Sequence, residues 1–207
     1  AAAPAAASVQ PARTTFVAGN DKRANEIAAS LVLVTFDMPF SVAGITERNY
    51  HGTGVIVDAE RGLVVVDRNT VPVAAGDVRL TFGGSIEVPG KVEYVHPLHN
   101  LAVVSFDPQA LDGTPIRAVK FDTRELEPGE PVTVVGLGGD SRLRTLATYV
   151  ATMDDVNFPL SRTLQFRDAN LEVVSLVNAP SDFDGVITGK DGRIRALWSS
   201  FATEGAR

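Results

Sequence analysis

The sequence lacks cysteine, and three classes of chemistry are excluded with it. With 0 Cys among 207 residues, the chain can form no disulfide, no thiolate nucleophile and no zinc–sulfur site. The 19 Lys and Arg are scattered among 25 Asp and Glu, for a net charge of -6, whereas nucleic acid and anionic lipid require clustered basic residues. The longest apolar run, residues 28–36, is too short to span a bilayer. We therefore expect no nucleic-acid partner and no membrane span.

The composition that remains is that of an ordinary globular protein, with 44% hydrophobic and 21% charged residues. Short segments rich in Val, Ile, Leu and Thr alternate with Asp, Gly and Pro turns, which is typical of β-strands. The predicted strands cover residues 30–36, 52–58, 62–67, 77–82, 85–95, 100–106, 131–137, 146–154, 162–168, 171–177 and 193–198. Many short strands at this spacing indicate an all-β barrel or sandwich.

The first residues differ from the rest of the chain. Residues 1–20 are rich in Ala and Pro without amphipathic periodicity, which predicts a linker or a frayed terminus. A linker would imply that a domain precedes this one. The sequence shows neither an initiator Met nor a signal peptide, so we expect a processed chain or an excised piece. Residues 21–31 predict one short helix, with Ile27 and Leu31 on one face. A proline-bearing stretch without a clear strand, residues 108–131, predicts the boundary between two barrels.

Four segments, in this order, resemble the trypsin-like serine proteases of the HtrA/DegP type. They are "YHGTGVIVDAERGLVVVDRNTV" at 50–71, "HPLHNLAVVSFD" at 96–107, "ELEPGEPVTVVGLGG" at 125–139 and "SDFDGVITGKDGRIRAL" at 181–197. The resemblance implies a chymotrypsin/trypsin-like double β-barrel over residues 21–207.

The positions that carry the catalytic triad in this family hold other residues here. By the resemblance, the His position falls on Asn69, the Asp position on Asn100 and the Ser position on Phe183. Asn69 has no nitrogen to act as a general base, Asn100 has no negative charge, and Phe183 has no nucleophile. Ser181 stands where the family has a glycine of the oxyanion hole, so the conformational freedom of glycine is absent there.

Two other readings stay open. Ser181 and His99 are the surviving hydroxyl and imidazole that a shifted register would bring together as a non-standard Ser/His site of an active serine endopeptidase. The barrel could also be a binding module unrelated to proteolysis, because a fold does not determine a function. We predict no cofactor and no metal site, since the Asp residues of "SDFDG" do not follow a calcium-loop pattern.

The resemblance implies a pseudoprotease domain with a structural, regulatory or protein-binding role in a larger serine-protease protein. Its implied partners are proteins or unfolded peptide segments and neighbouring protease or PDZ domains. A homotrimer, a place in the cell envelope or periplasm and a part in protein quality control are likewise implied by resemblance alone.

Overall fold

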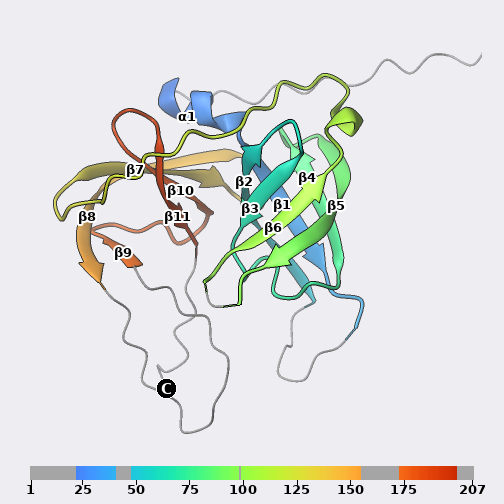
Figure 1. Cartoon of the computed structure of the whole chain (residues 1–207). Helices are drawn as coiled ribbons and strands as arrows, with labels where there is room; N and C mark the ends of the chain where they lie inside the picture. The colour runs from blue at the N-terminus through green and yellow to red at the C-terminus, as the bar shows by residue number, and fades with distance from the viewer. Residues whose placement is uncertain (1–21, 41–47, 98, 155–172, 200–207) are drawn as a thin grey trace, which may run out of the picture.

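The structure, a computed structural model, describes residues 22–40, 48–97, 99–154 and 173–199. These residues form two antiparallel sheets with a short helix at the start of the chain (Figure 1). The elements are α1 (Lys22–Ala28), β1 (Leu31–Asp37), β2 (Asn49–Asp58), β3 (Leu63–Val66), β4 (Asp77–Phe82), β5 (Ile86–Val95), β6 (Ala102–Phe106), a 3₁₀ turn η1 (Pro108–Leu111), β7 (Pro131–Leu137), β8 (Leu143–Asp154), β9 (Val173–Leu176), β10 (Asp184–Thr188) and β11 (Ile194–Trp198).

The first six strands close into a barrel in the order β1-β2-β3-β6-β5-β4. Closure occurs because β1 pairs with two strands at once: Leu33 lies opposite Thr53 of β2 on one side and opposite Thr81 of β4 on the other. Alternate residues point inward, as the two-residue period of a strand dictates. The interior is filled by fully buried apolar side chains that include Val34, Phe36, Ile56, Val64, Leu80, Phe82 and Val104.

The remaining strands form a five-stranded sheet in the order β11-β10-β7-β8-β9. Residues 107–130 connect the two sheets and run over the top of the molecule in Figure 1. The connection begins at η1, where the Asp107 side chain accepts a hydrogen bond from Gln109 N as an N-cap. It is then held to β11, since Asp122 N donates to Ile194 O and Ile194 N donates to Lys120 O, both at 2.9 Å.

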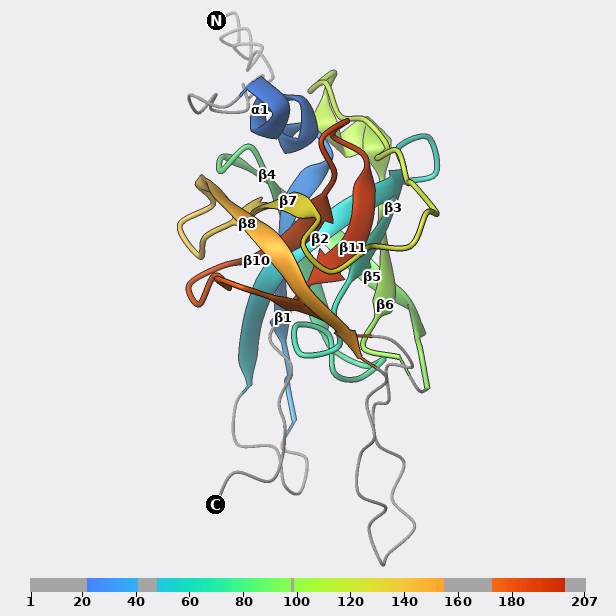
Figure 2. The same ribbon diagram turned by 90° about the vertical axis from the view of Figure 1, so that its left-hand side faces the viewer.

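The two sheets pack on each other and leave a junction between them. Leu31 and Val55 of the barrel share an apolar cluster with Val135 of β7 and Val186 of β10, and Ile27 of α1 covers it. Viewed from the side of the second sheet, β8 and β11 cross in front of the barrel strand β2 (Figure 2). Side chains at the end of this junction form the candidate site.

The expected all-β fold with a short N-terminal helix is confirmed, with differences in the elements. The helix ends at Ala28, and Ser30 N donates to Ile27 O to close a turn. Leu31 is therefore the first residue of β1 rather than part of the helix face. Strand β10 was absent from the expected series, because "SDFDG" reads as a turn. The predicted linker at 1–20 and the predicted strand at 162–168 lie outside the described residues.

The only α-helix in the described part of the chain has 7 residues. Across those residues no helix combines the length and the apolar character needed to cross a bilayer.

Candidate functional site

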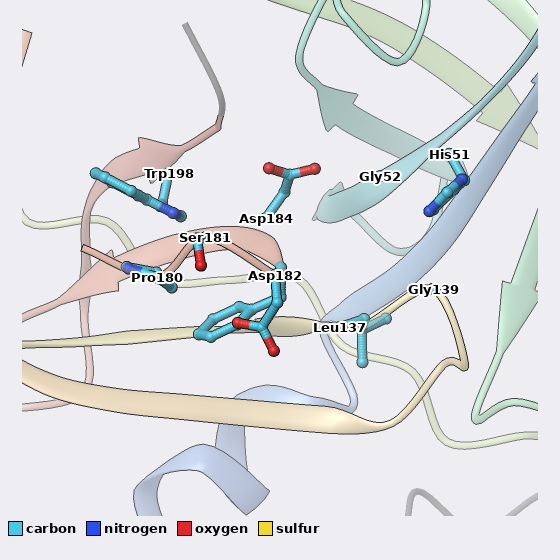
Figure 3. Close-up of a pocket in the computed structure, with 10 residues that line it drawn as sticks. His51, Gly52, Leu137, Gly139, Pro180, Ser181, Asp182, Asp184 and Trp198 are labelled. Atoms are coloured by element: carbon cyan, nitrogen blue, oxygen red, sulfur yellow. The ribbon is translucent and has the colours of Figure 1, made fainter.

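A pocket of about 270 Å³ opens at the junction of the two sheets. Ten residues line it, and Figure 3 shows His51 on one side and Trp198 on the opposite side. The lining residues are His51 and Gly52 from β2, Leu137 and Gly139 from the end of β7, Pro180, Ser181, Asp182, Phe183 and Asp184 from the turn into β10, and Trp198 from β11.

Thr53 fixes the two sheets to each other directly beside this pocket. Its side chain is 4% exposed, and its hydroxyl donates to Asp184 O at 2.6 Å while accepting from Leu137 N at 3.0 Å. Asp184 and Leu137 both line the pocket. One buried hydroxyl from the barrel thus holds two backbone segments of the second sheet in position.

The turn that carries Asn69 packs against the rim of the pocket. Asp67, which is buried, accepts from Thr70 N at 3.0 Å and from the Thr70 hydroxyl at 2.9 Å, so the turn is held by its own first residue. Burial raises the pKa of Asp67, and the hydrogen bonds from Thr70 oppose that rise. A Cβ on Gly52 would lie 2.1 Å from Thr70 Oγ1, so only glycine allows the pocket strand to approach this turn so closely.

Asn100 connects the Asn69 turn to the second sheet. Its side-chain oxygen accepts from Arg68 N at 2.9 Å, and its side-chain nitrogen donates to Ser199 Oγ at 3.1 Å. Arg68 directly precedes Asn69, and Ser199 directly follows the pocket residue Trp198. The side chain is buried, so its amide is used both as an acceptor and as a donor across the junction.

Phe183 and Ser181 both lie in the pocket, with different surroundings. Phe183 is half-buried, lines the pocket and packs against the apolar core of the second sheet. Ser181 is exposed, and Figure 3 shows its side chain between Pro180 and Asp182. Ser181 is not one of the non-glycine residues with positive φ, which in the described part of the chain are Asp112 and Ser141.

The imidazole that shares the pocket with Ser181 is His51, not His99. A Cβ on Gly139 would lie 3.0 Å from His51 Nε2, so the ring of His51 lies against that glycine. His99 follows β5, where its backbone N donates to His96 Nδ1 at 2.9 Å and the two rings stand 4.6 Å apart. Within the described residues, no hydrogen bond joins Ser181 to either His51 or His99.

Two carboxylates belong to the same pocket. Asp182 is exposed and pairs with Arg144 Nη1 at 3.2 Å, while Asp184 is half-buried. Arg144 also approaches Asp140 at 3.5 Å. Among the described residues, no group of three or more His, Asp and Glu side chains converges in a way that would hold a metal ion.

Sequence reasoning missed several residues that the pocket uses. Neither His51 nor Trp198 was among the candidate site residues, whereas the structure places His51 in β2 and Trp198, half-buried, on the pocket wall, where it also packs against the core of the second sheet. Thr53 was not singled out at all. Its signal, a single polar residue inside the "GTGVIV" strand, is visible in the sequence, but its partners lie 84 and 131 residues away.

Comparison with known proteins identifies trypsin-like peptidase domains and serine proteases as the relatives of this chain. A family model described as a trypsin-like peptidase domain matches residues 52–178. The chain is 34% identical over 189 residues to Protease Do-like 7 of Arabidopsis thaliana, covering 86% of this chain and 17% of that protein. It is 33% identical over 184 residues to the pro-apoptotic serine protease nma111 of Aspergillus oryzae, covering 87% of this chain and 18% of that protein.

A further relative is a PDZ domain-containing protein of Schizosaccharomyces pombe, 34% identical over 169 residues, with 81% of this chain and 17% of the relative covered. The chain therefore spans less than a fifth of the length of these relatives, at 17% to 18%.

Solved structures share the fold. The active form of the Rv3671c protease from M. tuberculosis superposes with a TM-score of 0.64 at 14% identity, covering 100% of this chain and 86% of that one. The HtrA-type protease AlgW, solved with a tripeptide, gives a TM-score of 0.64 at 13% identity, covering 88% of this chain and 55% of that one.

Proposed function

Because the chain belongs to the trypsin-like peptidase domain family, we propose that it is a member without peptidase chemistry, a pseudoprotease domain that binds protein segments within a larger serine-protease protein. The proposal assigns the degenerate triad to Asn69, Asn100 and Phe183. It gives the domain a structural or regulatory role in place of bond cleavage.

The bonding of Asn100 is the observation that carries this proposal. A carboxylate that orients a catalytic imidazole uses its oxygens as acceptors. Asn100 instead donates from its side-chain nitrogen to Ser199 Oγ at 3.1 Å and accepts from Arg68 N at 2.9 Å. The side chain at this position joins the backbone of Arg68 to the side-chain hydroxyl of Ser199 and carries no charge to stabilise an imidazolium.

The surroundings of Phe183 support the same function. A phenyl ring at the nucleophile position has no lone pair to attack a carbonyl carbon, and its contact with the core of the second sheet makes it part of the packing. At Ser181 the backbone is outside the left-handed region, so the chain does not form there the turn that a glycine would permit. This supports a site without the glycine turn on which the family's oxyanion hole relies.

The role in a larger protein rests on the relatives. They are named as proteases or as a PDZ domain-containing protein, and the chain accounts for under a fifth of their length. We infer that its partners are protein segments or neighbouring protease and PDZ domains of the same polypeptide. The trimer implied by the resemblance stays a prediction that sedimentation would test.

The test is turnover of an unfolded protein. The full chain is incubated with β-casein, and fragments are followed by mass spectrometry beside a matched Ser181→Ala variant. The proposal predicts intact casein in both samples. Cleavage that disappears in Ser181→Ala would instead establish an endopeptidase with a non-standard serine site. Equal cleavage in both samples that follows the protein through a further purification step would also overturn the proposal, because it would place a nucleophile elsewhere in the chain.

A further inference from the structure

The turn that carries Asn69 is organised around Asp67, a carboxylate inside the fold. Asp67 is 4% exposed and accepts hydrogen bonds from Thr70 N at 3.0 Å and from the Thr70 hydroxyl at 2.9 Å. We propose that Asp67 is a pH-sensitive latch. When protonated it holds the Asn69 turn closed against β2, and when ionised it loosens this turn and the link from the turn to the second sheet. The inference goes beyond the proposed function and does not depend on it, because it concerns a change of shape and not cleavage.

The charge of the ionised Asp67 has no counter-ion. Among the described residues, no Lys, Arg or His side chain pairs with Asp67, whose partners are Thr70 and backbone N–H groups of its own turn. A buried charge without a counter-ion costs free energy, because hydrogen bonds replace only part of the hydration that is lost. Burial accordingly raises the pKa of Asp67, although the hydrogen bonds from its turn oppose the rise.

The groups that face Asp67 from its own turn and from β2 are uncharged. Thr70 is the partner in the turn, and a Cβ on Gly52 of β2 would lie 3.3 Å from Asp67 Oδ2. The charged or titratable neighbours on these two elements are Arg68 and His51. Arg68 forms no ion pair with Asp67, and His51 lines the pocket.

The third element that contacts the turn is the segment before β6, and its contact residue is also uncharged. Asn100 of this segment accepts from Arg68 N at 2.9 Å. The titratable neighbour of Asn100 is His99, whose ring stands 4.6 Å from that of His96. Asn100 also donates to Ser199 Oγ at 3.1 Å, so a movement of the turn that breaks its bond to Asn100 frees a contact with the second sheet.

The same two contacts with Thr70 serve both protonation states of Asp67. In the neutral carboxyl, Oδ1 still accepts from Thr70 N, and the proton on Oδ2 is donated to the Thr70 hydroxyl, which accepts as well as donates. The two states therefore differ mainly in the buried charge, and the neutral state favours the closed turn. Because the pKa of Asp67 is raised above 3.8, this stabilisation is fully present below pH 3.8 and is lost as the pH rises through the pKa of the folded state.

The experiment is amide hydrogen exchange of the full ¹⁵N-labelled chain, followed by NMR between about pH 4.5 and about pH 7.5. Each rate is compared with that of the same amide in an unstructured peptide at the same pH, which gives a protection factor. The Thr70 N–H reports on the latch, and the Arg68 N–H reports on the link to Asn100. We expect the protection of both amides to fall by at least about threefold as the pH rises across this range.

Two variants locate the effect. Asp67→Asn has the shape of the neutral carboxyl, since its amide oxygen accepts from Thr70 N and its amide nitrogen donates to the Thr70 hydroxyl. It should keep the protection of the Arg68 N–H high at about pH 7.5 and abolish the dependence on pH. Asp58→Asn is the matched control. Asp58 also accepts from two backbone N–H groups, in the turn after β2, but it is only half-buried, so its replacement should leave the pH dependence at Thr70 and Arg68 unchanged.

Three outcomes would overturn the inference. The first is protection of the Thr70 N–H that stays constant or rises with pH in the wild-type chain, a result that decides even if Asp67→Asn does not fold. The second is a pH dependence that Asp67→Asn retains, which would assign it to another group. The third is a response of the Thr70 N–H without one of the Arg68 N–H, which would refute the link to the second sheet. None of these outcomes bears on the pseudoprotease proposal, because none involves cleavage.

Discussion

Replacing the Thr53 hydroxyl should weaken the junction that shapes the pocket. Thr53→Val keeps the shape of the side chain and removes the hydrogen bonds to Leu137 N and Asp184 O, at 3.0 Å and 2.6 Å. Each of these two backbone groups then loses the side-chain partner that it has in Thr53. Because Thr53 is only 4% exposed, water does not easily take the place of the lost hydroxyl.

The size of the effect follows from those two groups. An unsatisfied buried donor or acceptor costs about 1–3 kcal/mol, and the half-buried Leu137 and Asp184 favour the lower end of that range. The extra methyl of valine returns less than about 1 kcal/mol. The free energy of unfolding should therefore fall by about 2 kcal/mol, which lowers the urea midpoint by roughly 1 M for a chain of this size.

The assay is urea unfolding followed by tryptophan fluorescence, because Trp198 lies on the wall of the same pocket. Hydrogen exchange gives a second readout: exchange of the Leu137 N–H should become at least about fivefold faster in Thr53→Val. Thr53→Ser is the matched control, since it keeps the hydroxyl and loses only a methyl group. If Thr53→Val were no less stable than Thr53→Ser, the hydroxyl would not be what holds the sheets, and the reasoning would be refuted.

Three further predictions concern the contacts of the segment that connects the two sheets and of Asn100. The side chain of Arg195 is 1% exposed and bonds the Glu130 carboxylate and two backbone carbonyls. The Glu130 side chain is 27% exposed, so water partly replaces Arg195 in Arg195→Met, and the free energy of unfolding in urea should fall by about 1.5–3 kcal/mol. A loss under about 0.5 kcal/mol would show that these bonds do not hold the connection to β11. The Arg124 guanidinium lowers the pKa of Asp122 from 3.8 to about 2. The stabilisation of the folded state by the ionised Asp122 is therefore fully present above pH 3.8 and is lost as the pH falls toward 2. In Asp122→Asn, the free energy of unfolding in urea should not show this contribution to the pH dependence between these two values. Asn100→Leu takes the side-chain acceptor away from the Arg68 N–H and should lower the melting temperature by roughly 5 °C. An unchanged melting temperature would show that the Asn100 side chain does not stabilise the contact between the two sheets.

The sequence predicts the strands well where the alternation is strict. In β1 the buried Val32, Val34 and Phe36 recur every second residue, so local pattern and barrel packing agree. The helix was extended too far because Leu31 falls on the same helical face as Ile27. In the fold both side chains enter the same apolar cluster, one from α1 and one from β1, and local periodicity does not distinguish these arrangements.

The candidate site is less predictable, because its neighbours are distant in the chain. The resemblance points to Phe183 and Ser181, which both line the pocket. It does not lead to His51, whose ring meets Gly139, or to Thr53, whose partner Asp184 is 131 residues away. Such contacts depend on how the two sheets dock, and a period of two within one strand carries no information about that.

We propose that this trypsin-like fold contains no activated nucleophile. The most direct measurement is intact mass after incubation of the full chain with a fluorophosphonate, beside Ser181→Ala and with active trypsin as the positive control. We expect trypsin to be labelled and the mass of this protein, folded and in excess reagent, to stay unchanged. A stoichiometric adduct that maps to one serine and is absent in a heat-unfolded sample would contradict it, and loss of that adduct in Ser181→Ala would identify Ser181 as the surviving nucleophile.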